Sequence, residues 1–118
     1  MFRGLLLRES LKDEGVLDSV KVTKTEVWDV QNAEGGQPER WTAISFEGES
    51  DQADVVAEAM GQAIKPEWYA NFSTETHVYV MFEDRVFKYV KGDAAVRAKV
   101  EAYAISVGIP ETQVDWWE

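Results

Sequence analysis

The chain has 118 residues, 12 of them basic and 22 acidic, so its net charge is −10 at pH 7, and it contains no cysteine. This length fits a single domain over residues 1–118, and the 45% hydrophobic content is that of a globular protein rather than a disordered one. The charge disfavours nucleic acid and anionic membranes as partners, and the missing cysteine excludes disulfides, thiolate nucleophiles and zinc–cysteine sites.

The N-terminal half predicts three strands. Phe2–Leu7 is a short apolar run. In residues 20–30 the apolar residues Val20, Val22, Trp28 and Val30 fall at even positions, which indicates a half-buried strand, and residues 40–47 alternate in the same way. Residues 31–39 carry two glycines and a proline, so we expect them to form the loop of an antiparallel hairpin.

The C-terminal half predicts a helix, a hairpin and a second helix. Apolar residues recur at helical spacing from Val56 to Ile64 and stop at Lys65-Pro66. The segments 76–82 and 85–90 flank a two-residue turn, which predicts a hairpin that pairs Phe82 with Arg85. A final helix starts after Asp93 and ends at Gly108.

This element order predicts an α+β fold, because single strands do not alternate regularly with helices. We expect an antiparallel sheet of about four to five strands with two helices packed on one face, and a ferredoxin-like arrangement is one candidate. The uncovered face would then include Tyr79 and Met81, which makes these two residues the predicted dimer interface. No apolar run reaches the roughly 20 residues of a membrane span, and Phe2–Leu7 is too short for a signal-peptide core, so we expect a cytoplasmic protein.

Six motifs along nearly the whole chain resemble a family of small prokaryotic proteins without an assigned activity: GLLLRESL (4–11), VLD (16–18), WT (41–42), KPEWYANF (65–72), VF (86–87) and GIPETQVD (108–115). The resemblance implies a small cytoplasmic α+β domain and carries over no catalytic residue. The chain departs from the family pattern at Asn71, where histidine is usual, and over residues 73–76, where an acidic glycine turn is usual.

Aromatic residues supply the candidate ligand-binding positions. Trp68, Tyr69 and Phe72 follow Pro66 on a connector, and together with Tyr103 they could wall a pocket, because aromatic rings with one polar atom suit ligand sites. The alternative is that they plug one end of the core. Adjacent Trp116 and Trp117 point in opposite directions in an extended tail, so one is expected to pack on the domain and the other to meet a partner.

His77 is the single histidine and therefore the one candidate general base. An enzymatic alternative uses His77 with Tyr69 or Tyr103 and needs no cofactor. The simpler interpretation is a half-exposed histidine on a strand. We expect no metal site, because the acidic residues lack the alternating oxygen-ligand pattern of a calcium loop.

Charge is concentrated in one segment, since residues 26–58 contain nine acidic residues and one basic residue. Such a segment either is a solvated surface or attracts a basic protein partner, as a nucleic-acid mimic would. The leading hypothesis is an acidic interaction or small-ligand-binding domain that forms a homodimer through its open sheet face. The alternatives are the small enzyme and the acidic mimic.

Overall fold

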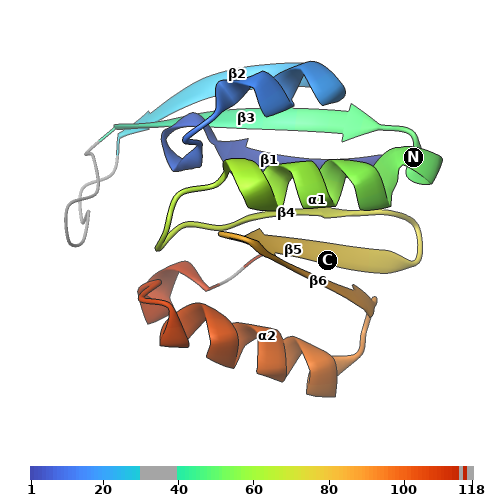
Figure 1. The fold of residues 1–118 in the computed structure, drawn as a ribbon, viewed down its shortest axis with the longest axis vertical. Helices are drawn as coiled ribbons and strands as arrows, with labels where there is room; N and C mark the ends of the chain where they lie inside the picture. Colours follow the sequence, from blue (N-terminus) through green and yellow to red (C-terminus); the bar gives the residue numbers. More distant parts are fainter. Residues whose placement is uncertain (30–39, 115, 117–118) are drawn as a thin grey trace.

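The structure is a computed structural model that describes residues 1–29, 40–114 and 116. One antiparallel sheet runs through the molecule in the order β2-β3-β1-β4-β5-β6 (Figure 1). Its strands are β1 (Phe2–Leu7), β2 (Lys21–Asp29), β3 (Arg40–Gly48), β4 (Ala70–Ser73), β5 (His77–Phe82) and β6 (Arg85–Val90). The two α-helices are α1 (Ala53–Ala63) and α2 (Ala94–Ser106), and the short 3-10 helices are η1 (Arg8–Ser10), η2 (Glu14–Ser19), η3 (Ser50–Gln52) and η4 (Glu111–Gln113).

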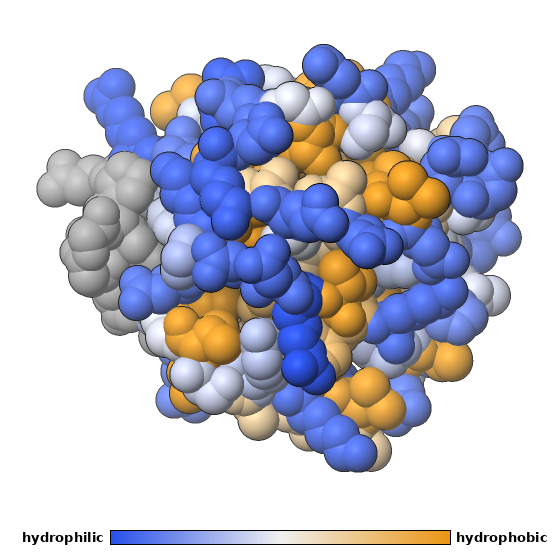
Figure 2. Space-filling view, in the orientation of Figure 1, coloured by the Kyte–Doolittle hydropathy of each residue, from blue (hydrophilic) through white to orange (hydrophobic). Residues whose placement is uncertain are grey.

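Helix α1 covers the middle of one face of the sheet, as Figure 1 shows. Its buried residues include Val56 and Met60, one turn apart, so they form a stripe that faces the sheet. The helix ends at Ala63 because Ile64 already has an extended backbone and Pro66 follows. Beneath α1 lie apolar side chains from four strands: Phe2, Leu6, Ile44, Phe46, Ala70, Phe72, Tyr79 and Met81. From this side the molecule shows mostly hydrophilic side chains, with the apolar ones in separate patches (Figure 2).

Helix α2 packs on the opposite face, over β5 and β6. The Asp93 carboxylate accepts a hydrogen bond from the Val96 amide at the start of the helix, and Gly108 closes its end with a φ of 95°. Val100 and Ala104 are fully buried in this layer. They share a second core with strand residues Val78, Val80, Phe82 and Tyr89.

The expectation that both helices pack on one face is therefore wrong. Strand β5 is buried on both faces, because its alternate side chains belong to the two different cores. Tyr79 is 4% exposed and Met81 is 0% exposed, both on the α1 side. The prediction that these two residues form a dimer interface is consequently wrong, because both are core positions.

The antiparallel α+β architecture is confirmed, with six strands instead of four to five; the ferredoxin-like arrangement is not confirmed. The additional strand is β4, in the segment predicted to be an aromatic connector. It pairs with β1 and β5 and so joins the two halves of the sheet. The hairpin of β5 and β6 has the predicted register, with Phe82 opposite Arg85.

A register irregularity in β2 places Val22 and Trp28 on opposite faces of the sheet, although their even spacing in the sequence predicts the same face. The register shifts between Val22 and Lys24, so Val22 lies opposite Phe46 whereas Trp28 lies opposite Trp41. Phe46 and Trp41 are an odd number of residues apart in β3, and they therefore point to opposite faces. Trp28 consequently lies on the face that carries α2, and Val22 on the face that carries α1.

Gly4 is required where β1 passes between β3 and β4. A Cβ there would overlap the carbonyl oxygen of Asn71 and lie 2.5 Å from the Cβ of Phe72. On the β3 side, the same Cβ would lie 2.8 Å from the ring of Phe46.

No helix in the described part of the chain is long and apolar enough to cross a membrane.

Candidate ligand-binding groove

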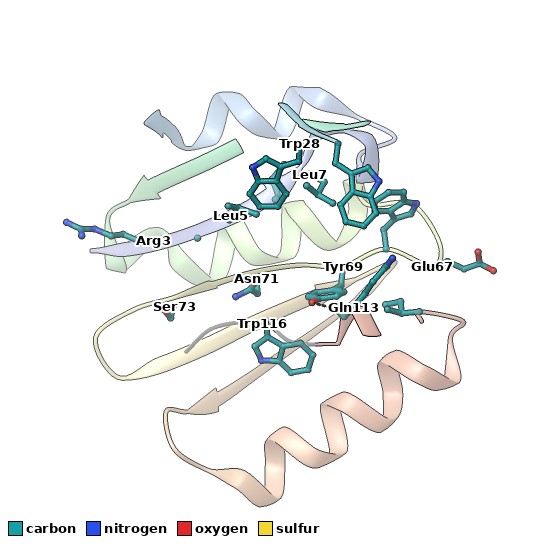
Figure 3. Close-up of a pocket in the computed structure, with 15 residues that line it drawn as sticks. Arg3, Leu5, Leu7, Trp28, Glu67, Tyr69, Asn71, Ser73, Gln113 and Trp116 are labelled. Atoms are coloured by element: carbon teal, nitrogen blue, oxygen red, sulfur yellow. Dashed lines mark hydrogen bonds between the residues drawn. The ribbon is translucent and has the colours of Figure 1, made fainter. Parts of the chain in front are cut away.

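The face that carries α2 is covered at only one end, and the described residues leave a groove over its other half. Helix α2 packs on β5 and β6, whereas the side chains of β2, β3, β1 and β4 on this face border an open cavity of about 600 Å³ (Figure 3). This volume is within the range of small-molecule sites. The groove is lined by Arg3, Gly4, Leu5, Leu6, Leu7, Trp28, Trp41, Glu67, Trp68, Tyr69, Asn71, Ser73, Ile109, Gln113 and Trp116.

The floor of the groove is made by β1 and β4. Alternation along β1 sends Phe2 and Leu6 into the α1 core and leaves Leu5 and Leu7 on the groove side. Leu5 is 36% exposed, so the floor presents apolar surface to solvent. On β4 the same alternation places Asn71 beside this surface. The floor therefore combines an apolar strip with an amide group that can form hydrogen bonds.

Tryptophan side chains form the wall above the floor in Figure 3. Trp28 and Trp41 lie directly opposite each other on β2 and β3, and the rings of Trp41 and Trp68 meet edge to face at 5.7 Å. Trp28 is 40% exposed, and its Nε1–H donates to the Glu26 carboxylate at 3.3 Å. The Nε1 of Trp41 is buried and has no hydrogen-bond partner among the described residues. Trp41 and Trp68 therefore pack against each other within this wall.

The C-terminal segment and the start of β4 form the other wall. The Tyr69 hydroxyl donates to the Gln113 carbonyl at 2.5 Å, and the Tyr69 ring meets Trp116 edge to face at 5.5 Å. Trp116 in turn donates its Nε1–H to the Tyr89 hydroxyl at 2.8 Å. In Figure 3, Trp28 and Trp116 lie on opposite sides of the groove, with Leu5 and Asn71 between them. This wall is therefore fixed to the α2 core by hydrogen bonds and ring contacts.

Among the described residues of the lining, the charged ones stand at the two ends of the groove. Arg3 lies at one end, forms an ion pair with Glu47 at 3.8 Å and points away from the cavity in Figure 3. Glu67 lies at the other end, next to Trp68, and its carboxylate also points outward. Its backbone φ is 67°, a conformation that is uncommon for a residue with a Cβ. The aromatic middle of the groove thus contains no charged side chain from the described residues.

Two of the four predicted ligand-binding residues and one predicted interface residue come together here. Trp68, Tyr69 and Trp116 all border the groove, although Trp116 is itself 4% exposed and packs into the domain. Phe72 does not, because it points into the α1 core and is 0% exposed. Tyr103 does not either, since it packs against Phe82 in the α2 core. Trp117 lies outside the described residues.

The predicted combination of His77 with Tyr69 or Tyr103 is not assembled. His77 shares a face with Tyr79 and Met81, on the α1 side, whereas Tyr69 and Tyr103 belong to the other side of the sheet. The ring Nδ1 of His77 lies 2.8 Å from the Thr76 hydroxyl. The sheet therefore separates the imidazole from both tyrosines. Among the described residues, no three His, Asp or Glu side chains gather closely enough to hold a metal ion.

A second, smaller cavity of about 330 Å³ lies between α1 and β6 and includes the Asp54 carboxylate. The Tyr79 hydroxyl donates to this carboxylate at 2.7 Å and Lys88 Nζ donates to it at 3.2 Å. The hydrogen bond from Tyr79 lowers the pKa of Asp54, and burial together with that same bond raises the pKa of Tyr79. This cluster fastens the first turn of α1 to the sheet, which is a sufficient structural reason for its presence.

Most residues of the groove, among them Trp28, Trp41 and Leu5, were not identified as binding residues from the sequence. The two tryptophans were recognised only as strand residues, and Leu5 only as part of a buried strand. A signal for the two tryptophans is present in the sequence: Trp28 and Trp41 stand at nearly equal distances on either side of the predicted loop 31–39, and the structure pairs them across the two strands.

Comparisons of the chain with protein-family models, with curated protein sequences and with solved structures find no significant match. The family resemblance of the sequence motifs therefore stays a prediction, and the groove is interpreted from its own chemistry.

Proposed function

We propose that this protein is a cytoplasmic, non-enzymatic binding domain that holds a small organic molecule in the groove. The observation that carries the proposal is the open, aromatic half of the sheet face, where Trp28 and Leu5 remain exposed at 40% and 36%. Ligand pockets are typically concave, mainly apolar and supplied with a few polar groups, and this groove has that composition. A bound molecule would remove the exposed indole and leucine surface from water, which is favourable.

The framework of the groove supports binding without large rearrangement. Its floor lies on the central strands β1 and β4, and its C-terminal wall is held by the bonds from Tyr69 to Gln113 and from Trp116 to Tyr89. Side chains fixed in this way lose little conformational entropy when a ligand binds. The groove is therefore a preformed site rather than one that has to be built around its ligand.

A fragment screen monitored by two-dimensional NMR tests the proposal. The five tryptophans provide five indole N–H signals, and substitution of each tryptophan by phenylalanine assigns them. We expect hits to shift the signals of Trp28, Trp41 and Trp68 together with the Leu5 amide. Hits that shift only residues of the cavity around Asp54, or a library without any hit, would contradict the proposal.

A matched pair of variants locates the site. Leu5→Arg places a long charged side chain on the groove floor and is expected to abolish binding of the hits. Val90→Arg introduces the same side chain at a 55% exposed position on the α1 side, outside the groove, and is expected to leave binding unchanged. Equal effects of the two variants would argue against the groove as the site.

A further inference from the structure

Outside the middle of the groove, several aromatic rings have an Arg or Lys side chain of the protein lying over them. Arg85 lies over the rings of Phe87 and Tyr103, with its Cζ 4.8 Å and 5.2 Å from the two centroids. Lys88 lies 5.2 Å from the centroid of Tyr79, and Arg97 lies 4.9 Å from that of Trp116. Cations are attracted to the negative face of an aromatic ring, so in each of these contacts a basic side chain of the protein already interacts with the ring.

Three of the four tryptophans that line the groove differ from these rings. Among the described residues, no Lys or Arg lies over the ring of Trp28, Trp41 or Trp68. Indole is the aromatic side chain that attracts cations most strongly. Trp28 also donates its N–H to the Glu26 carboxylate, which places a negative group at the edge of this ring, although Glu26 pairs with Lys24 as well. The groove therefore offers indole surface that no cation of the described chain occupies.

The charge of the protein favours the same class of ligand. The net charge is −10, which attracts cations and repels anions over the whole surface. The basic residue of the lining, Arg3, is 78% exposed, paired with Glu47 and directed away from the cavity, so it offers little to an anionic ligand. At the tryptophan end the charged residue is the acidic Glu67.

From this combination we propose that the ligand of the groove is an organic cation, an alkylated ammonium group on an apolar body, held against the tryptophan surface of Trp28, Trp41 and Trp68. The inference rests on the proposed function and specifies its ligand class. Two sources share this chemistry: a free small molecule, and the methylated lysine side chain of a peptide.

Three probes of nearly equal shape separate charge from size: choline, its neutral isostere 3,3-dimethylbutan-1-ol, and the anion 3,3-dimethylbutanoate. Titration of each, followed by the indole N–H signals, is expected to give tightest binding for choline, at least about fivefold tighter than for the alcohol, with the anion weakest. The affinity for choline should fall as the salt concentration rises, because the field of the protein is screened.

Two further measurements identify the source and the rings. Titration with Nα-acetyl-Nε-trimethyllysine methylamide shows, by comparison with choline, whether a peptide side chain or a free molecule is preferred. Trp28→Leu should weaken choline binding at least about fivefold, whereas Trp28→Phe should retain part of it. Val27→Ala, at a 65% exposed position of the same strand, is the matched control and should have no effect.

The outcomes separate this inference from the proposed function. Equal binding of choline and the neutral alcohol, with shifts at the groove tryptophans, would overturn the cation inference and leave the ligand-binding function in place. The cation inference also fails, and the ligand-binding function again stands, if no probe binds while neutral fragments do. If neither probes nor fragments bind, both proposals fail.

Discussion

Replacing Met81 with alanine tests the two-sided packing of the sheet. Met81 is 0% exposed, on the α1 face of β5, between Ala70 on β4 and Val86 on β6. The neighbouring strands are held by the ladder and cannot collapse into the space that the side chain leaves. The cost should therefore be about 3 kcal/mol, from lost burial plus the remaining cavity. Since a domain of this size is stable by about 5–15 kcal/mol, the loss is a large fraction of the total.

Urea unfolding followed by tryptophan fluorescence measures this loss. With a slope of about 1.5 kcal/mol per molar urea, the midpoint should fall by about 2 M. Leu5→Ala is the control, because Leu5 is 36% exposed in the groove, and it should cost less than about 1 kcal/mol. If Met81→Ala left the midpoint unchanged and altered only the mass in solution, Met81 would be an interface residue and the assigned layers would be wrong.

Three further substitutions probe other parts of the fold. Gly4→Ala should destabilise the protein by at least about 2 kcal/mol, because the new Cβ overlaps Asn71, and a normal unfolding midpoint would disprove this close approach. Asp93→Ala removes the bond to the Val96 amide and should cost about 1 kcal/mol in the same assay, with an unchanged midpoint as the opposing result. Tyr79→Phe should cost about 1 kcal/mol at neutral pH. Because the pKa of Tyr79 is raised in the fold, its contribution is present below its usual value of about 10 and is lost as the pH rises through the folded value. As the pH rises above about 10, the variant should consequently lose less stability than the parent, and identical pH profiles would refute this role.

Most helices and strands were predictable from the sequence, because turn residues, helix caps and hydrophobic spacing depend on a few neighbouring residues. The two-residue turn at Glu83-Asp84 fixed the register of β5 and β6, and Asp93 and Gly108 marked the ends of α2. Strand β4 was missed because its four residues are close to Pro66 and a run of aromatics, which also fits an irregular connector. It is a strand because its backbone pairs with β1 and β5, and this pairing is not visible in the sequence.

The groove was not predictable for a related reason. Alternation along β5 shows which side chains share a face, but it does not show which helix covers that face. The bulge after Val22 also moves Trp28 to the opposite side from the one that Val22 occupies, and this shift is visible only in the pairing with β3. Trp68 and Tyr69 were found because three aromatics within five residues are a compositional signal that needs no tertiary information.

The most direct test of the groove as a ligand site is an isotope-filtered nuclear Overhauser experiment with choline bound to the labelled protein. Binding in the groove predicts contacts from the choline methyl protons to the ring protons of Trp28 in the wall and to the methyl groups of Leu5 in the floor. Contacts confined to Tyr79, Lys88 and the remainder of the smaller cavity would contradict it.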